Sequence, residues 1–367
     1  MNPYIPNELP LQDLDYKRLF AFVGNANAEL ARYDGLLQGV VNPAILLSPL
    51  TTNEAVLSSK IEGTQATLDE VLEHEAGLDM DIEKRHDIQE IVNYRSALMQ
   101  AETFLTDNPL SLYLIRQMHH TLLDSVRGKN KSPGSFRTDQ NWIGKYGCSM
   151  EDASFVPPSP LILQEFLEKW EAYVQDNDID TLVQLAIVHA QFELLHPFKD
   201  GNGRIGRLLI PLFLYKKEKL ASPMFYLSSY LESHRDEYYA KLAAISNDND
   251  WNGWVEFFLK AITEQAIENA QKVRRMTALY DEMKARIVEA THSQYAIQVL
   301  DALFNQPIFK TSDFIKRTQI SKTTAMSLLK RIRENGDLVV IREGKGRQSS
   351  ILGFHALLSI AEGKEFV

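Results

Sequence analysis

The sequence predicts a mainly α-helical protein with a small β-hairpin flap and a C-terminal winged helix-turn-helix (α+β) domain. Two patterns carry this prediction. Through the first 290 residues apolar side chains recur every three or four positions, which is the period of a helix that packs one face on a core. After residue 293 three short helical segments precede two strand-like segments, the order of a winged helix. The 367 residues, 44% of them hydrophobic, suffice for one large domain and one smaller one.

Helices are expected wherever the helical period persists in the first part of the chain. These segments are residues 53–62, 81–105, 111–126, 161–175, 179–195, 204–216 and 251–288. Residues 141–144 and 153–156 are strand-like and a Pro-Pro pair follows them, so they predict a short hairpin, the only sheet of this part. In the last part, helices are expected at 295–305, 311–318 and 321–335, and strands at 338–342 and 349–354.

Composition excludes several classes of protein. A net charge of −10 argues against a protein that covers nucleic acid or membrane with its whole surface, although Lys and Arg outnumber Asp and Glu by 11 to 7 from Gln294 onward. The single cysteine, Cys148, excludes an internal disulfide and a cysteine metal cluster. The first residues lack the apolar core of a signal peptide, and no apolar stretch reaches the roughly 18 residues of a membrane helix. We therefore expect a cytoplasmic protein that does not bind membranes.

The most informative segment is residues 196–207, HPFKDGNGRIGR. Pro197 cannot continue the helix before it, so His196 is expected at a helix end. The glycine-containing loop then leads into a new helix, whose first N–H groups lack intrahelical partners and favour an anion. Arg204 and Arg207 lie three apart on one face of that helix, so both reach the same anion. This pattern predicts a phosphate-binding loop.

Two side chains of the segment predict chemistry on the bound phosphates. Asp200 offers the carboxylate that Mg²⁺ prefers beside phosphate oxygens and water. His196 has a side chain whose usual pKa lies near neutral pH, which suits it to remove a proton from an incoming hydroxyl. The segment therefore predicts a general base and a Mg²⁺ ligand next to an anion site.

These residues match the Fic family signature HxFx(D/E)GNGRxxR at every specified position, and the chain resembles this family over about residues 10–290. The likeness extends to residues 190–193 before the segment, to the Tyr residues at 230, 238 and 239, and to residues 133–158, which are similar to the family's substrate-docking flap. The resemblance implies the Fic helical bundle. It also implies transfer of AMP from ATP to a Ser, Thr or Tyr hydroxyl of a target protein, with release of pyrophosphate.

The resemblance assigns roles to individual residues. His196 is the base, Asp200 holds Mg²⁺, and Arg207 holds the γ-phosphate of ATP. The implied ATP-binding residues are Gly201, Asn202, Gly203, Arg204, Gly206, Arg207 and Ser233. Relatives that transfer a γ-phosphoryl group have lysine in place of the second loop glycine, so Gly203 argues against that branch. Transfer of other nucleotide or phosphocholine groups stays open, because the loop alone does not recognise the base. The flap residues expected to pair with the target backbone by strand addition are Trp142, Ile143, Phe155 and Val156.

A second motif lies upstream. Residues 58–63, SSKIEG, resemble the Fic inhibitory motif (S/T)xxxE(G/N). Ser58 and Glu62 are four residues apart and share a helix face, and Gly63 suits the residue that ends the helix. The resemblance implies that Glu62 pairs with Arg207 and displaces the γ-phosphate of ATP, so that the enzyme inhibits itself.

With these assignments the chain divides into four parts. They are an N-terminal helical region at 1–110 that contains the inhibitory helix at about 53–63, a Fic catalytic core at 111–250, a long connecting helix at 251–292 and a winged helix domain at 293–367. Self-modification and a homodimer are left open.

Two alternative functions also stay open. In the first, the winged helix binds DNA and the Fic domain only senses a nucleotide. The candidate DNA contacts are residues 321–324, Lys330, Arg331, Arg333 and, in the wing, Lys345 and Arg347. In the second, the enzyme acts mainly to remove AMP from a modified target. A toxin with a separate antitoxin is disfavoured because the inhibitory motif is in the same chain, and a zinc hydrolase because His189 and His196 lack the spacing of a helical zinc site.

Overall fold

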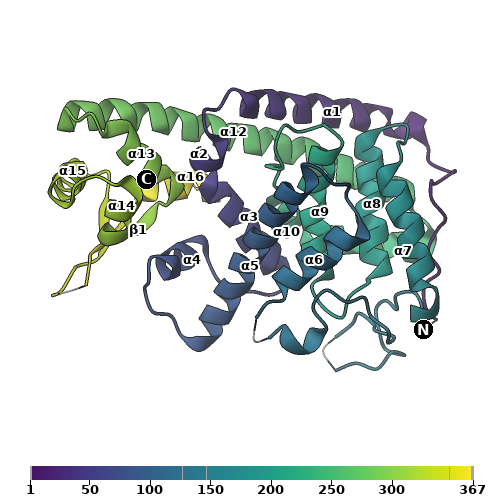
Figure 1. Cartoon of the computed structure of the whole chain (residues 1–367). Helices are drawn as coiled ribbons and strands as arrows, with labels where there is room; N and C mark the ends of the chain where they lie inside the picture. Colours follow the sequence, from purple (N-terminus) through teal and green to yellow (C-terminus); the bar gives the residue numbers. More distant parts are fainter. Residues whose placement is uncertain (1, 126, 146, 347, 365–367) are drawn as a thin grey trace. The chain divides into compact units, whose positions relative to one another are not determined.

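The computed structural model describes residues 2–125, 127–145, 147–346 and 348–364. It is mainly helical and contains a small sheet (Figure 1). Its elements are α1 Tyr16–Gln38, α2 Pro43–Leu46, α3 Ser48–Ile61, α4 Leu68–Glu75, α5 Ile82–Leu105, α6 Leu112–Leu122, the 3-10 helix η1 Lys129–Lys131, α7 Pro160–Gln175, α8 Thr181–Leu195, α9 Asn202–Lys216, α10 Ser228–Ser233, α11 Arg235–Asp248, α12 Trp251–Thr291, α13 Ala296–Asn305, β1 Ile308–Lys310, α14 Thr311–Thr318, α15 Lys322–Glu334, β2 Val339–Arg342, β3 Ile351–Gly353 and α16 His355–Glu362. Within these described ranges, no helix is both long and apolar enough to cross a lipid bilayer.

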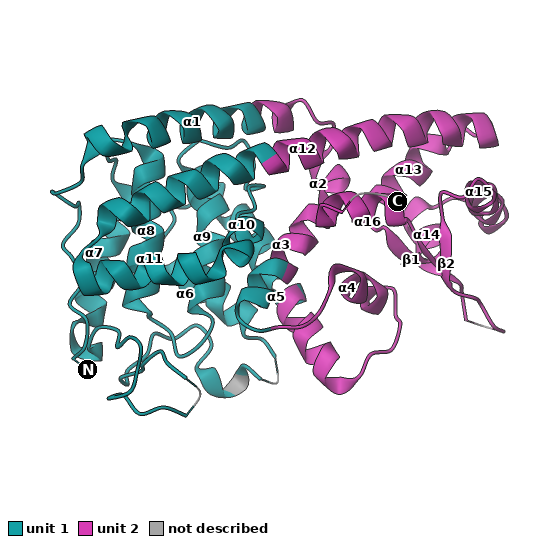
Figure 2. Cartoon of the chain, turned by 180° about the vertical axis from the view of Figure 1, so that it is seen from behind, with its two compact units in different colours: residues 1–34, 57–63, 92–267 teal, residues 35–56, 64–91, 268–367 magenta. Residues whose placement is uncertain are grey.

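The chain forms two compact units (Figure 2). Unit 1 consists of residues 1–34, 57–63 and 92–267, and unit 2 of residues 35–56, 64–91 and 268–367. Each unit therefore draws on segments that are far apart in the sequence. The division into four consecutive parts stays a prediction, because the two units group segments by contact and not by chain order.

Helix α8 is the buried centre of unit 1. Nearly all of its residues are inaccessible to solvent, as expected for a helix that is apolar on every side, and α9 packs along it. Asp180 caps its N-terminus by accepting hydrogen bonds from the first backbone N–H groups of the helix. The indole N–H groups of Trp170 and Trp254 donate to backbone carbonyls of α8 at 2.9 and 2.8 Å. These contacts hold the helix whose C-terminal end leads into residues 196–201.

Unit 2 contains the sheet, in which the antiparallel strands have the order β1-β3-β2. Leu352 of the central strand lies opposite Phe309 on one side and Val340 on the other. Helices α13, α14 and α15 precede β2 and β3, the order that the sequence analysis expects. Phe314 of α14 and Leu329 of α15 are fully or nearly fully buried, so the helices and the sheet share a core.

Several elements differ from the sequence-based expectation. The apolar period does not predict α1, α10, α11, α16 or β1, and the three residues of β1 are too few for an alternating pattern. The expected flap hairpin is reduced to a single bridge between Ile143 and Phe155. Helix α3 begins at Ser48 rather than at residue 53, because Pro49 fits the first turn of a helix. Helix α6 ends at Leu122, since Leu123 leaves the helical backbone.

Candidate active site

His196 stands where α8 ends. It adopts a left-handed backbone conformation (φ 45°), which turns the chain out of the helix before Pro197. The loop behind it is closed by Asn202, whose side-chain oxygen accepts from the backbone N–H of Phe198 at 2.8 Å and whose amide donates to the carbonyl of the same residue at 2.9 Å. The ring of Phe198 is fully buried. The loop is therefore anchored at both ends and in the core.

Arg137 ties this loop to the end of α8. Its side chain is nearly fully buried and donates to the carbonyls of His196 at 3.0 Å, Pro158 at 2.6 Å and Leu195 at 3.3 Å. Burial lowers the pKa of Arg137 to about 10, so the group stays charged at neutral pH. A cation at this position also suits the negative end of the helix dipole. The sequence analysis does not find this residue, because its partners are backbone carbonyls of distant segments.

His119 supports the loop from the other side. The backbone N–H of Gly134 donates to its Nδ1 at 2.8 Å, so the proton of the neutral ring is on Nε2, which lies 3.0 Å from the carbonyl oxygen of Asp200. The ring stacks on Phe198 with centroids 3.7 Å apart. Burial lowers the pKa of His119 to about 4, which keeps this tautomer neutral. His119 is thus a structural residue of the loop.

His196 itself is neutral at physiological pH. Burial lowers its pKa to about 4, and the charge of Arg137 acts in the same direction, whereas a backbone hydrogen bond at Glu193 and the charges of Glu62 and Asp200 oppose the shift. An uncharged imidazole has a free ring nitrogen that accepts a proton. The site therefore holds His196 in the form that a general base requires.

Asp200 lies at the rim of the loop. Its side chain is 43% exposed, accepts from the N–H of Gly201 at 2.6 Å and lies 3.4 Å from the guanidinium of Arg204 and 3.9 Å from the ammonium of Lys131. Across the described ranges, no group of three or more His, Cys, Asp or Glu side chains has the arrangement of a metal site. An accessible single carboxylate fits Mg²⁺ only if phosphate and water supply the remaining ligands.

Arg207 lies inside the protein and contacts Ser58 and Glu62 of the SxxxEG motif. Its side chain is 1% exposed and donates to the hydroxyl and the carbonyl of Ser58, both at 2.9 Å, and to the carboxylate of Glu62 at 2.6 Å. Burial acts to raise the pKa of Glu62, but the charge and hydrogen bond of Arg207, together with Arg204 and His196, outweigh it and the pKa is lowered. Burial acts to lower the pKa of Arg207, and Glu62 raises it above its usual value. The contact between Glu62 and Arg207 expected from the motif is present.

The glycines of α9 make room for carboxylates. A Cβ atom at Gly203 would lie 2.2 Å from Oε1 of Glu62 and 2.9 Å from Nη1 of Arg207. A Cβ atom at Gly206 would lie 2.1 Å from Oε1 of Glu193. Glu62 therefore rests against the first turn of α9, where the unpaired N–H groups favour a negative charge.

Glu193 is a buried acid next to this ion pair. Its Oε1 has no hydrogen-bond partner, and burial raises its pKa to about 8, although Arg207 acts to lower it. His189, one turn earlier, lies with its ring nitrogens 3.0 Å from the carbonyl of Gly206 and 3.0 Å from the hydroxyl of Tyr238. Both ring nitrogens of His189 thus have partners in the core.

The flap residues differ in exposure. Trp142 and Ile143 are 42% and 41% exposed, and Phe155 is partly buried. Val156 is buried, and its carbonyl accepts from the backbone N–H of Tyr4 at 2.9 Å. The structure therefore places Val156 in the interior of unit 1, where it does not offer a docking surface.

Ser233, at the end of α10, is tied to its own segment. Its hydroxyl donates to the carbonyl of Tyr230 at 3.0 Å and lies 3.0 Å from Nδ1 of His234. The structure thus gives Ser233 local partners. Its role in ATP binding stays a prediction.

Comparisons with known proteins match the chain to one family. The profile described as "Fic/DOC family N-terminal" matches residues 20–103, and "Fic/DOC family" matches residues 109–214. A probable protein adenylyltransferase of Aquifex aeolicus is 27% identical over 174 residues, which are 46% of this chain and 49% of that protein. Protein adenylyltransferase Fic of Drosophila mojavensis is 25% identical over 274 residues, or 71% of this chain and 47% of that protein. The chain spans about half the length of these curated relatives.

Solved structures share the fold. A Fic family protein from Desulfovibrio desulfuricans matches with a TM-score of 0.59 at 18% identity, covering 96% of this chain and 98% of that one. A Fic domain containing signaling protein from Bacteroides thetaiotaomicron matches with a TM-score of 0.55 at 18% identity, covering 68% of this chain and 97% of that one. The mainly α fold expected from the sequence is confirmed.

Replacing Glu193 with glutamine is expected to make stability less dependent on pH above neutrality. The buried neutral carboxyl stabilises the fold fully below its unfolded pKa of 4.5, and this contribution is lost as the pH rises through its folded pKa of about 8. Between about pH 6.5 and about pH 9 the unfolding temperature of the wild type should therefore fall more than that of Glu193→Gln. Glu165→Gln, at a side chain that is 62% exposed, is the control and should follow the wild type. Parallel curves for all three proteins would refute the assignment.

Proposed function

Because the chain belongs to the Fic/DOC family, we propose that it is a protein adenylyltransferase, which transfers AMP from ATP to a Ser, Thr or Tyr hydroxyl of a target protein and releases pyrophosphate. The observation that carries this proposal is the neutral imidazole of His196 beside an anion site made by the N-terminus of α9 and Arg207. Curated relatives named protein adenylyltransferase support the same activity.

In the proposed reaction His196 acts as the general base. Its free ring nitrogen takes the proton of the target hydroxyl as the hydroxyl oxygen attacks the α-phosphorus of ATP. A bond from that oxygen to phosphorus forms, and the bond from phosphorus to the oxygen that bridges to the β-phosphate breaks, so pyrophosphate leaves. Positioning and charge stabilisation supply the catalysis, as in other phosphoryl transfers.

The start of α9 is the proposed phosphate site. The backbone N–H groups at residues 201–203 and the side chain of Arg204 would bind the α- and β-phosphates, and Arg207 the γ-phosphate. Asp200, accessible at the rim, would hold Mg²⁺, which would neutralise part of the phosphate charge when bound. Arg137 and Asn202 keep His196 and the loop in place without touching the reacting atoms.

The proposal includes inhibition by Glu62. The carboxylate of Glu62 accepts from the guanidinium of Arg207, the group that the γ-phosphate would need. It also lies against Gly203, where a side chain would leave no room for an anion. ATP that binds while Glu62 is in place would then lack the contact that aligns its α-phosphorus with His196. Ser58 holds the other side of the guanidinium, so Arg207 stays in position when Glu62 leaves.

The flap gives a proposed place for the target backbone. The N–H and carbonyl of Ile143 both bond to the opposite strand at residues 154 and 155. In an antiparallel pair, the residues before and after such a residue direct their backbone N–H and C=O groups away from the partner strand, to the free edge. We expect a target segment to add at that edge, beside Trp142 and Gly144, because the edge at Val156 is already taken by Tyr4.

Labelled ATP tests the reaction. With Mg²⁺ and a protein acceptor, label from the α-phosphate should become protein-bound, whereas label from the γ-phosphate should appear only in pyrophosphate. His196→Ala should lose transfer by at least about a hundredfold, the usual contribution of a general base. His120→Ala, on α6, is the matched control and should keep activity. Transfer of the γ-label to protein, or full activity of His196→Ala, would contradict the proposal.

Replacing Glu62 with glycine tests the inhibition. Transfer should rise by at least about tenfold, equivalent to about 1.4 kcal/mol, because Arg207 becomes available to the γ-phosphate. Glu62→Gln keeps the size of the side chain and removes its charge, so it should also raise transfer, whereas the exposed control Glu165→Gln should not. Unchanged transfer in both Glu62 variants, with unfolding temperatures showing that they fold, would rule out the inhibitory role.

A further inference from the structure

Helix α15 has a one-sided surface that AMP transfer does not use. Its buried face consists of Ala325, Leu328, Leu329 and Ile332. The opposite face is exposed and consists of Lys322, Thr323, Met326, Ser327, Lys330 and Arg333. Apart from Met326, and Glu334 beside Lys330 at the end of the helix, this exposed face carries hydroxyl groups and positive charges.

The connection from α14 to α15 is that of a helix-turn-helix. Gln319 takes a left-handed conformation (φ 53°) that ends α14, and Ile320 is buried in the turn. Ser321 then caps α15 by accepting from the N–H of Thr324. In such a motif the second helix is the one that enters the major groove of DNA, with residues near its N-terminus facing the base edges. Here those residues are exposed and polar.

Positive charge is concentrated in this part of an acidic protein. Residues 308–353 contain ten Lys and Arg against four Asp and Glu, whereas the whole chain has a net charge of −10. A local excess of Lys and Arg in an otherwise acidic protein favours the binding of phosphates by this segment.

The basic side chains of α15 differ in whether they bond to the protein or are exposed and able to contact DNA. Arg331 donates to the carbonyls of Ala290 at 3.2 Å and Thr291 at 3.3 Å, at the end of α12, so it is removed from the candidate DNA contacts. The guanidinium of Arg333 is exposed and has no hydrogen-bond or ion-pair partner within the described part of the chain. Lys330 lies 3.7 Å from Glu334, and both side chains are more than half exposed, so this pair is weak.

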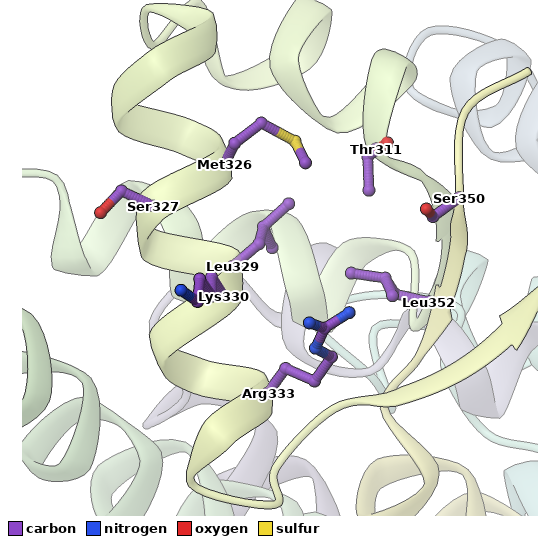
Figure 3. Close-up of a pocket in the computed structure, with 8 residues that line it drawn as sticks. All are labelled: Thr311, Met326, Ser327, Leu329, Lys330, Arg333, Ser350 and Leu352. Carbon is purple, nitrogen blue, oxygen red and sulfur yellow. The ribbon is translucent and has the colours of Figure 1, made fainter. Parts of the chain in front are cut away.

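A cavity of about 370 Å³ lies between α15, the start of α14 and β3 (Figure 3). The residues that line it are Thr311, Met326, Ser327, Leu329, Lys330, Arg333, Ser350 and Leu352. Figure 3 shows the guanidinium of Arg333 directed toward Leu352, with the hydroxyls of Thr311 and Ser350 on the strand side. A cation with nearby hydroxyls is the usual set of donors to a DNA phosphate.

We propose that α13 to β3 form a winged helix that binds double-stranded DNA through the exposed face of α15. A protein partner would need an apolar anchor at the centre of the contact, and Met326 is the single large apolar side chain of that face. Lys330 and Arg333 contact phosphates, and Thr323 and Ser327 lie toward the bases. Lys345, in the loop between β2 and β3, is exposed and adds a contact to the phosphate backbone of the DNA. Arg347 lies outside the described residues.

The test measures binding of the full chain to a labelled mixed-sequence duplex of about 30 base pairs, roughly three helical turns, by fluorescence anisotropy. Affinity should fall steeply between about 50 and about 200 mM salt, because bound phosphates release counterions. The double variant Lys330→Ala/Arg333→Ala should bind at least about tenfold more weakly, with a salt slope smaller by about two. Its AMP transfer and unfolding temperature should not change.

The matched control removes two positive charges from unit 1. Lys17→Ala/Lys260→Ala changes two exposed lysines and should bind the duplex like the wild type. Excess ATP with Mg²⁺ should not displace the duplex. The proposal is overturned if the wild type does not bind at low salt, if the α15 variant keeps the wild-type affinity and salt slope, or if ATP displaces the duplex, which would place the DNA at the phosphate loop.

Discussion

The charge of Arg207 is the constraint on which the rest of the site depends. Its guanidinium is buried, and a buried guanidinium without an anion costs several kcal/mol. Ser58 and Glu62 satisfy it in the structure. The anion at this place is replaceable, because Glu62 reaches it from the end of α3 and its own side chain is 35% exposed. One position therefore serves the carboxylate of the chain and, as we propose, the γ-phosphate of ATP.

The other hydrogen bonds that hold the loop do not involve the anion beside Arg207. Arg137 holds the carbonyl of His196, Asn202 closes the loop, and His119 holds the carbonyl of Asp200. None of these contacts involves Glu62. Departure of Glu62 thus leaves a loop whose N–H groups and imidazole are already placed, which is the preorganisation that electrostatic catalysis requires. The regulation that we propose for Glu62 would then need movement of one side chain at a helix end rather than rearrangement of the fold.

Local patterns predict the site better than they predict its supports. The spacing from His196 to Arg207 predicts the loop and the helix start, and the resemblance of residues 58–63 to the Fic inhibitory motif predicts the pairing of Glu62 with Arg207. Arg137, His119 and the orphan carboxyl of Glu193 act through backbone carbonyls or burial, which depend on segments distant in the sequence. In the flap, Ile143 and Phe155 form a single bridge, and the carbonyl of Val156 accepts from the backbone N–H of Tyr4 instead. The alternation of apolar residues in a strand cannot predict this contact, because Tyr4 is distant in the sequence.

The most direct test is the structure of wild type and Glu62→Gly with a non-hydrolysable ATP analogue bound. We predict that in Glu62→Gly the γ-phosphate of the analogue contacts Arg207 and the α-phosphorus faces the ring of His196. In the wild type, Glu62 should keep Arg207 and the γ-phosphate should lie elsewhere. An analogue whose γ-phosphate avoids Arg207 in Glu62→Gly, or whose triphosphate lies the same way in both proteins, would contradict the account.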